Sequence, residues 1–514
     1  MTAVTESYKL ETKDVLDLIN EIETVLPVHE WKTNGFHIWP LLRIQLSFQL
    51  DSLIAKPMNA RSSQHIHAAL AKAFKIPNGL SRYYAAKISD NTHNETLDGK
   101  ADCFFYSYSS ARRFRVKDAW YDVYTDPLIG KLAEHNLSSK VLEYADDAQF
   151  RTPRFRSSRL ENPLILHMMQ GRTYTDPYFS LSDELRKYLM SYKQFLTQRK
   201  LERFFPDEGS IRFRVLMIRF YAEYFKRIFR NMTPRFAFGS NYYGFREMGL
   251  NLACKETGVI SVDIQHGVQG NMHVAYGRWT KVPDGGYEVM PDVFWNWSDE
   301  EKAVIDKWAA NTHGKHRSIV GGNPLLETFS DPAGKLSSEF DHDVKVVFGS
   351  VPSCILKHIL VTLQPDVGIS EPLKAILANS SKEFFWWIRL HPNMVSQENR
   401  TKDQLREYAS LNWNVDGATS LPLYALLKKM DVHMTASSST VIEAEYFGVP
   451  SILIHPQAQA LYPAQIEKRI AQYASSFEGA LKLVAALARQ AAQTSIPSVS
   501  KMTRGLEELL RSAS

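Results

Sequence analysis

A run of hydroxyl side chains stands at the centre of the most informative stretch of the chain, residues 431–455. The consecutive hydroxyl residues are Ser437, Ser438, Ser439 and Thr440. The surrounding pattern predicts a buried strand, this polar turn, a short helix ending at Gly448 and a second buried strand. Hydroxyls and free amides at a helix N-terminus suit a phosphate, and a carboxylate one turn later, Glu443, suits a ribose diol. Thr440 and Glu443 also fit a capping box, but a cap needs only one hydroxyl, so ligand binding is favoured.

A second group, Arg389-Leu390-His391-Pro392, follows the strongly apolar run FFWWI. An imidazole at the end of a strand, followed by a proline suited to the first turn of a helix, can donate an N–H to a phosphate. Arg389 adds a positive charge. A histidine–proline pair also fits a proline-punctuated turn with an exposed ring. Because His391 is expected on the same sheet edge as the hydroxyl turn, the two groups together predict a phosphate site.

A third group begins with the sequence DIQHG, which contains Asp263, Gln265 and His266, and continues to His273 and Tyr276. A strand that runs into a glycine-containing polar turn would gather a carboxylate, two imidazoles and a phenol. These are the groups that general acid–base catalysis needs. Alternatively, Asp263 caps a turn and the later residues belong to an ordinary loop. No zinc site is predicted, because the residues lack the i, i+4 spacing of helical metal ligands.

The elements that must position these groups alternate between helices and strands. Helices are predicted at Thr12–Val25, Ile38–Leu53 and Ile211–Ile228. The strands predicted first are Cys103–Tyr108, Ser139–Tyr144, Arg235–Gly239, Val259–Ile264, Asp292–Trp297 and Ser318–Val320. Those predicted after them are Val344–Phe348, Ile359–Gln364, Phe384–Leu390, Trp413–Val415, Val432–Thr435 and Ile452–His455. Strands that alternate with helices favour parallel, doubly wound sheets, so we expect the α/β class.

Three regions follow from this pattern. Residues 1–100 form a mainly helical region, residues 101–343 a first α/β domain, and residues 344–514 a second α/β domain with C-terminal helices. A polar stretch at 81–100 and a linker near 325–343 separate them.

Composition and missing motifs exclude several functions. The 514 residues carry a formal net charge of +5, which is small for this length and argues against a dedicated nucleic-acid binder. No GxxxxGK[ST], GxSxG or strand-linked GxGxxG sequence is present. Nucleoside triphosphatase, hydrolase and dehydrogenase functions therefore lack their usual support.

The cysteines and the apolar runs bear on the cellular setting. Three scattered cysteines predict neither a disulfide framework nor a metal cluster, and we expect a reducing, cytoplasmic setting. The first residues lack the features of a signal peptide, and no apolar run is long enough for a membrane span. The basic, aromatic-rich segment Phe195–Phe229 predicts either a peripheral contact with the inner face of an anionic membrane or simply a solvated helix face, which is the commoner case.

Three pieces of sequence carry a resemblance to a known architecture: DIQHG at 263–267, RLHP at 389–392 and SSSTVIEAEYFGVP at 437–450. Their order and spacing resemble bacterial capsule and lipopolysaccharide glycosyltransferases of the GT-B type, in which two Rossmann-like domains face a cleft. Within that group, an HP motif paired with a serine/threonine motif is similar to transferases that use CMP-activated acidic sugars, such as Kdo or sialic acid. The resemblance covers roughly residues 235–455.

The resemblance implies a glycosyltransferase. A sugar would move from a nucleotide-activated donor, with a CMP-linked acidic sugar such as Kdo favoured, to a surface-polysaccharide or lipid-linked glycan acceptor. Neither a metal nor a cofactor is implied. The HP-motif sialyltransferases also carry an acidic-acidic-glycine motif that supplies the base, and the first domain has no match to it.

The resemblance also implies roles for single residues. His391, Arg389 and the hydroxyl turn 437–440 would hold the nucleotide phosphate, and Glu443 the ribose or base. Asp263 is assigned as the catalytic carboxylate, with His266 as its partner. The predicted contacts to the sugar or acceptor are Gln265, His273 and Tyr276.

Other functions stay open. The same motifs are similar to those of CDP-glycerol-type phosphotransferases. A nucleotide-sugar 2-epimerase shares the two-domain architecture and needs acid–base residues at the cleft. A non-catalytic glycan or nucleotide-sugar binding protein could retain the fold without the chemistry.

Overall fold

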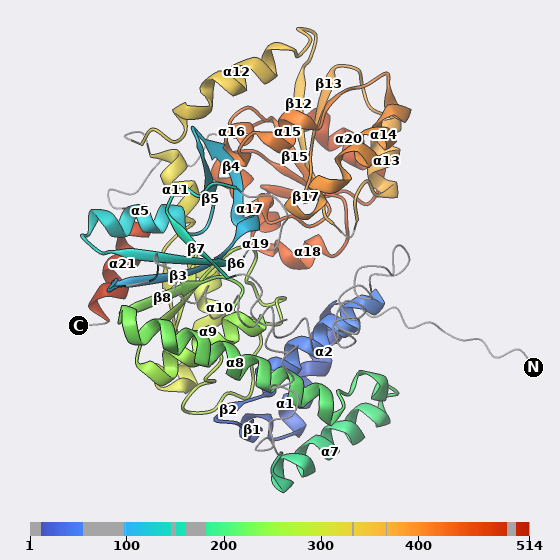
Figure 1. Cartoon of the computed structure of the whole chain (residues 1–514). Coiled ribbons are helices and arrows are strands. Elements are labelled where there is room, and N and C mark those ends of the chain that lie inside the picture. Colours follow the sequence, from blue (N-terminus) through green and yellow to red (C-terminus); the bar gives the residue numbers. More distant parts are fainter. Residues whose placement is uncertain are drawn as a thin grey trace, which may run out of the picture.

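The computed structural model describes residues 12–54, 97, 99–144, 151–160, 181–331, 334–365, 367–490 and 500–512. Two parallel sheets organise these residues (Figure 1). Most of the predicted polar boundary at 81–100 lies outside the described residues. The α/β class predicted from the alternating pattern is confirmed.

The first sheet has the strand order β7-β6-β3-β8-β9-β10-β11, and every neighbouring pair is parallel. Its strands are β3 (Cys103–Tyr108), β6 (Ser139–Tyr144), β7 (Ser157–Leu160), β8 (Phe236–Gly239), β9 (Ile260–Ile264), β10 (Val293–Asn296) and β11 (Arg317–Val320). The helices that follow them include α5 (Asp126–Glu134), α9 (Phe245–Thr257) and α10 (Asp299–Ala309). The order reverses between β3 and β8, so the carboxyl ends of these two strands form a topological switch point, where doubly wound sheets bind ligands.

The second sheet repeats this plan with the order β14-β13-β12-β15-β16-β17, again parallel throughout. Its strands are β12 (Lys357–Thr362), β13 (Phe384–Arg389), β14 (Asn412–Asn414), β15 (Val432–Thr435), β16 (Ser451–Leu453) and β17 (Ala471–Tyr473). The helices around it are α13 (Glu371–Ala378), α14 (Glu398–Leu405), α15 (Asp416–Ser420), α16 (Leu423–Leu427), α17 (Thr440–Tyr446), α18 (Ala458–Leu461), α19 (Pro463–Glu467) and α20 (Phe477–Ala486). The switch point lies between β12 and β15.

The apolar run in β13 shows why a central strand needs no polar alternation. Phe385 and Trp387 belong to the core on one side of the sheet, whereas Trp386 and Ile388 belong to the core on the other. Successive side chains of a strand point to opposite faces, and both faces of a parallel sheet are covered. The predicted strand at 384–390 is therefore confirmed, and it carries Arg389 and His391 to the carboxyl edge of the sheet.

One predicted strand is wrong. Residues 344–348 lie within helix α12 (Asp341–Gly349), after the short helix α11 (Pro324–Ser330) in the predicted linker. Val344, Val347 and Phe348 pack into a core at helical spacing, whereas Val346 is 61% exposed. A short apolar run does not distinguish a strand from one face of a helix.

One helix after the predicted domain boundary at residue 343 does not pack with the second sheet. Helix α21 (Lys501–Arg511), which the predicted boundary groups with the second domain, packs against the first sheet (Figure 1). Met502, Leu506 and Leu509 share a core with Trp295 and Ile319. At the closest approach, a Cβ atom on Gly505 would lie 2.7 Å from the Cα atom of Gly321, so this crossing requires glycine.

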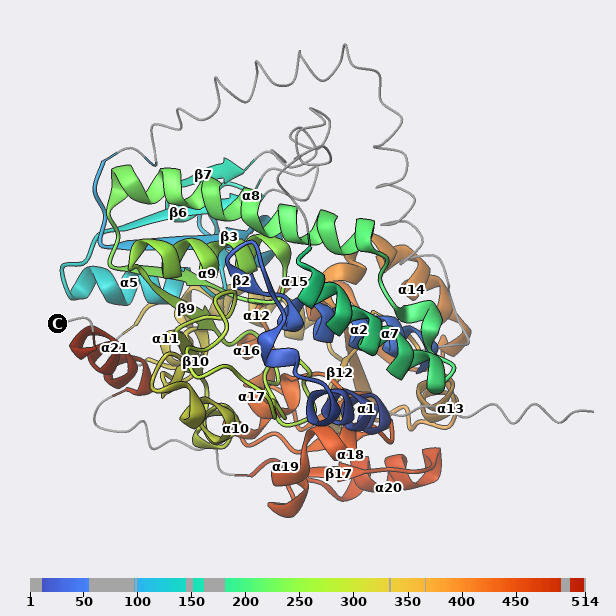
Figure 2. The same ribbon diagram turned by 90° about the horizontal axis from the view of Figure 1, so that it is seen from below.

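The described N-terminal residues contain the two helices predicted near Thr12–Val25 and Ile38–Leu53, and they pack onto the first domain. This region contains α1 (Thr12–Val25), α2 (Trp39–Ile54) and the two-stranded pair β1 (Lys32–Thr33) and β2 (Phe36–His37). It shares one core with α7 (Asp183–Gln198), α8 (Glu208–Met232) and α9, and Figure 2 shows α1 and α2 beside α7. Trp31, for example, meets the ring of Tyr192 with centroids 5.5 Å apart.

Helices α7 and α8 carry the basic segment Phe195–Phe229. At least three of its cations are paired within the described residues: Arg199 contacts Glu21, Arg219 contacts Glu256, and Lys226 contacts Glu223 and Glu256. In the described part of the chain, no helix is both long and apolar enough to cross a bilayer. A peripheral contact with a membrane stays a prediction.

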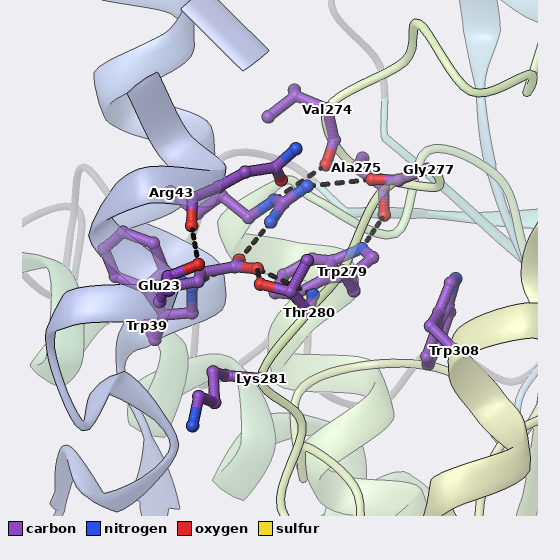
Figure 3. A network of polar contacts seen from close by, with 12 residues as sticks. Glu23, Trp39, Arg43, Val274, Ala275, Gly277, Trp279, Thr280, Lys281 and Trp308 are labelled. Carbon is purple, nitrogen blue, oxygen red and sulfur yellow. Dashed lines mark hydrogen bonds and ion pairs between the residues drawn. The ribbon is translucent and has the colours of Figure 1, made fainter. Parts of the chain in front are cut away.

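A buried ion pair fixes the N-terminal helices to a loop of the first domain (Figure 3). Glu23 on α1 and Arg43 on α2 pair with their side chains fully buried. Glu23 also accepts hydrogen bonds from Trp39 Nε1, at 2.9 Å, and from the N–H and hydroxyl of Thr280, both at 2.7 Å.

Arg43 completes the connection to the loop. Its Nε and Nη2 donate to the carbonyl oxygens of Val274 and Gly277, at 3.0 and 2.8 Å, and its guanidinium lies 4.1 Å from the ring centre of Trp279. Residues 274–280 belong to the segment that follows the DIQHG turn. Its position therefore depends on two helices that lie far away in sequence.

We predict that Arg43→Ala destabilises the protein by about 3–5 kcal/mol, because it leaves the Glu23 carboxylate buried without its cation. The urea midpoint of unfolding measures the loss. Arg186→Ala, which removes a surface cation paired with Asp183 and Glu208, is the control and should shift the midpoint far less. Equal shifts in the two variants would contradict the role of the buried pair.

Candidate functional site

A cavity of about 1750 Å³ lies where the carboxyl edges of the two sheets meet. Both switch points open into it: residues after β3 and β8 line one wall, and residues after β12, β13 and β15 line the other. This is the arrangement of two Rossmann-like domains around a cleft that the GT-B resemblance predicts. Phe48 of α2 also reaches the cavity, so the N-terminal region contributes to its wall.

The second-sheet wall contains most of the predicted phosphate-binding residues. These are Arg389, His391, Ser438, Ser439 and Thr440. The Nδ1 atom of His391 accepts the backbone N–H of Asn393 at 3.2 Å, which orients the ring at the start of the short helix η6 (Pro392–Gln397). Arg389 donates from Nη1 to the carbonyl oxygens of Ala418 and Leu421, at 2.6 and 2.7 Å.

The hydroxyl turn is not a capping box. Ser439 precedes α17 without a side-chain cap, and it is Ser438 Oγ that accepts the N–H of Thr440, at 3.3 Å. Ser437 does not line the cavity, and its carbonyl oxygen accepts the hydroxyl of Tyr462 at 2.9 Å. The turn therefore offers three hydroxyls to a ligand instead of the predicted four.

Glu443 is the most unusual side chain of this wall. It is only 9% exposed, and burial raises its pKa to about 7, although the positive charges of Arg113 and Arg389 oppose the rise. Oε1 accepts the hydroxyl of Tyr424 at 3.3 Å, whereas Oε2 has no hydrogen-bond partner in the described structure. A buried, unpartnered carboxyl oxygen is costly, and a ligand hydroxyl would satisfy it.

His266 reaches the opposite wall. Burial lowers its pKa to about 3, so its imidazole is neutral at physiological pH. Its Nδ1 atom is buried without a partner, and its Nε2 atom lies 3.5 Å from the hydroxyl of Tyr243. A neutral imidazole with an open nitrogen can accept a proton or a hydrogen bond from a substrate.

Asp263 does not lie in the wall beside His266. It is 3% exposed and accepts hydrogen bonds from the Tyr242 N–H, at 3.1 Å, and from the Tyr276 hydroxyl, at 2.9 Å. Burial raises its pKa to about 8. Asp263 and Tyr276 therefore hold each other inside the first domain, a position that does not support the predicted catalytic role of Asp263.

The other predicted sugar contacts are also engaged within the protein. Gln265 borders the cavity, but its amide donates to Gly267 and Glu301 and its Oε1 accepts the Trp297 N–H, at 2.7 Å. The His273 ring accepts the N–H of Ala275 at 3.2 Å and does not line the cavity. These residues position the DIQHG turn without facing a ligand.

The acid that does face the cavity from the first domain is Glu247, in the first turn of α9. It contacts the hydroxyl of Tyr108, and burial raises its pKa to about 7. A Cβ atom on Gly244 would lie 2.0 Å from Glu247 Oε2, so the glycine leaves space for the carboxylate. Glu247 could have been predicted from the sequence, because residues 236–247 repeat the order of strand, polar turn and acid that surrounds the hydroxyl turn.

Among the described residues, no group of three or more His, Cys, Asp or Glu side chains is placed to hold a metal ion. A second cavity, of about 1620 Å³, lies on the other side of Glu443, between first-domain loops and α17 to α19. We place the site in the first cavity because both switch points open there.

The chain is similar to several solved structures in the arrangement of its elements alone. No family model matches the chain, and no curated protein matches its sequence. Solved structures similar in fold include a UDP-GlcNAc 2-epimerase from Methanocaldococcus jannaschii, at 11% identity and a TM-score of 0.48, covering 80% of this chain and 99% of that one. The Neisseria meningitidis UDP-GlcNAc 2-epimerase bound to UDP-GlcNAc has 14% identity and a TM-score of 0.49, covering 80% and 100%.

The glycotransferase of kitacinnamycin is similar at 13% identity and a TM-score of 0.40, covering 80% of this chain and 96% of that one. At such low identities and scores, the likeness concerns the arrangement of the chain and not its activity. None of these three is described as a CMP-sugar transferase.

We predict that Glu443→Gln changes the pH dependence of stability. Below about pH 4.5 the carboxyl is protonated in the folded and unfolded chain alike. As the pH rises through 7, the folded protein must hold a carboxylate that burial disfavours, whereas the unfolded chain is already ionised. The wild type should therefore be less stable than Glu443→Gln at pH 8, by about 3 kcal/mol at most, with the difference vanishing near pH 4.

Thermal unfolding across pH 4–9 measures this difference. Glu478→Gln removes an exposed carboxyl at the start of α20 and serves as the control, with no pH-dependent gain expected. A gain for Glu443→Gln that stayed constant across the pH range would contradict the assignment of a buried, proton-accepting carboxyl.

Proposed function

We propose that this chain is an enzyme that acts on a nucleotide-activated sugar. The observation that carries the proposal is the unpartnered carboxyl oxygen of Glu443, placed in one wall with His391 and the hydroxyls of 438–440. Hydroxyls and an imidazole suit a phosphate, and a carboxylate suits a ribose diol. The nucleotide would therefore lie against the second sheet, with its sugar directed toward Glu247 and His266.

Glycosyl transfer is the reaction that the cavity supports best. A site for one small molecule measures about 300–1,000 Å³, whereas this cavity is about 1750 Å³, large enough for a donor together with an acceptor. A CMP-linked acidic sugar such as Kdo as donor, and a surface-polysaccharide or lipid-linked glycan as acceptor, are proposed on the resemblance of the sequence motifs alone.

In this reaction, Glu247 acts as the general base. An acceptor hydroxyl attacks the anomeric carbon and gives its proton to the carboxylate, while the bond to the nucleotide phosphate breaks and leaves its electrons on the phosphate. A base with a pKa near 7 is suited to this step at neutral pH. Arg389, His391 and the turn hydroxyls would stabilise the departing phosphate.

A nucleotide-sugar 2-epimerase is the second candidate. Glu247 and His266 face the same cavity, where an epimerase would need acid–base residues. An epimerase needs only one substrate, so the volume of the cavity is not an argument for this reaction.

A panel of CMP-, CDP- and UDP-activated sugars, with and without glycan acceptors, tests the proposal. Release of free nucleotide that depends on an acceptor identifies a transferase, and a changed sugar that stays on its nucleotide, seen by NMR, identifies an epimerase. Absence of both products and of any nucleotide binding across the panel would overturn the proposal.

We predict that Glu247→Gln lowers kcat about 10²- to 10⁴-fold and leaves the Kd for nucleotide nearly unchanged, because the base lies across the cavity from the nucleotide. His391→Ala should do the opposite and weaken nucleotide binding. Glu256→Gln, which removes a carboxylate from the last turn of the same helix α9, is the matched control and should retain activity. Full activity of Glu247→Gln would exclude it as the base.

A further inference from the structure

A two-stranded hairpin connects the first domain to the second. It consists of β4 (Arg112–Val116) and β5 (Ala119–Asp122), which pair antiparallel outside the two large sheets. In Figure 1 it rises from the first sheet toward α11, α16 and α17. Although these residues follow β3 directly in the sequence, the hairpin lies among elements of the second half of the chain.

Aromatic packing holds the hairpin there. Phe114 stacks on Tyr121 with ring centres 5.1 Å apart and meets Phe340 edge-on at 5.4 Å. Both hairpin residues are buried in a core that also contains Phe329 and Trp387. Burying two aromatic side chains contributes several kcal/mol, so this core holds the hairpin in place.

Strand alternation then directs two arginines into the site. Phe114 is buried in the shared core, whereas Arg113 and Arg115 on either side of it are exposed and line the cavity. Arg115 turns to Asp118, with Nη2 3.3 Å from Oδ1. Arg113 instead donates from Nη2 to the hydroxyl of Tyr124 at 2.6 Å, with its guanidinium 5.2 Å from the centre of that ring.

Arg113 faces the nucleotide side of the cavity. Its positive charge lowers the pKa of Glu443 and, after burial as the main cause, that of Arg389, which falls to about 10. Arg389 remains protonated at neutral pH. Two cations from different domains, Arg113 and Arg389, therefore line the same cavity. Within the described residues, neither guanidinium forms an ion pair with a carboxylate. An anion placed between them would relieve their repulsion and supply the missing partner.

We propose that Arg113 and Arg389 clamp the phosphate of the bound nucleotide between the two domains. This inference rests on the proposed function and extends it, because the phosphate site is complete only with a residue from the first-domain hairpin. Arg113 is held in place by Phe114 and Tyr124 before the ligand arrives, so little ordering is needed on binding. Arg389 is held likewise by the carbonyl oxygens of Ala418 and Leu421.

The experiment must decide which anionic group contacts Arg113. A carboxylate on an acidic sugar could bind an arginine as the nucleotide phosphate does. Calorimetry measures binding of CMP, CDP and UDP, of the nucleosides cytidine and uridine, and of CMP-sialic acid. The variants are Arg113→Ala and Arg113→Lys. The control Lys117→Asn removes a cation from the tip of the same hairpin, where the backbone has a φ of 55° that asparagine tolerates and the side chain borders the other cavity.

The clamp predicts that Arg113→Ala weakens the nucleotides roughly 10- to 100-fold and leaves the nucleosides unchanged. Arg113→Lys, which keeps the charge but loses the paired donors, should fall between Arg113→Ala and the wild type. Lys117→Asn should bind as the wild type does. Equal melting temperatures for Arg113→Ala and Lys117→Asn would show that the loss reflects binding and not folding.

Other outcomes overturn the proposal in different ways. A wild type that binds no nucleotide refutes the proposed function, and the clamp with it. If the wild type and Arg113→Ala bind the nucleotides with equal affinity, the clamp alone is refuted. A loss in Arg113→Ala that is confined to CMP-sialic acid assigns Arg113 to the sugar carboxylate and refutes the phosphate contact.

Discussion

The buried pair of Glu23 and Arg43 is the interaction on which the position of the first-domain site depends. Two opposite charges without solvent persist only when further hydrogen bonds surround them, and here those bonds come from residues 274–280. The same segment supplies Tyr276, which holds Asp263 at the end of β9. The N-terminal helices therefore help to support the first-domain wall of the cavity and are not an appended module.

Two segments pack against the domain to which their position in the sequence does not assign them. The hairpin β4–β5 packs into the core of the second half, and α21 returns to pack on the first sheet. Each contact buries aromatic or aliphatic side chains, so each resists separation of the domains.

The sequence predicts the sheets better than the site, for a physical reason. Strands such as FFWWIR are recognisable because burial on both faces requires an apolar run, and the polar turns after them mark the edge where ligands bind. Whether a polar side chain then points into the cavity or into the core depends on packing that no local pattern encodes. Asp263 lies near the end of strand β9 and accepts the hydroxyl of Tyr276, whereas Glu247 lies on a helix and reaches the cavity.

Glu443 and Glu247 have pKa values near 7 for the same reason, burial, yet their surroundings give them different roles. Arg113 and Arg389 are neighbours of Glu443, so an anion bound there would screen these cations and raise the pKa of Glu443 further. The protonated carboxyl then donates a hydrogen bond and holds the ligand. Glu247 lies among tyrosines, with Arg246 as its charged neighbour, and stays in reach of ionisation when the nucleotide binds. Under the proposed function, the acid beside the arginines would bind the ligand, and the acid beside the tyrosines would exchange the proton.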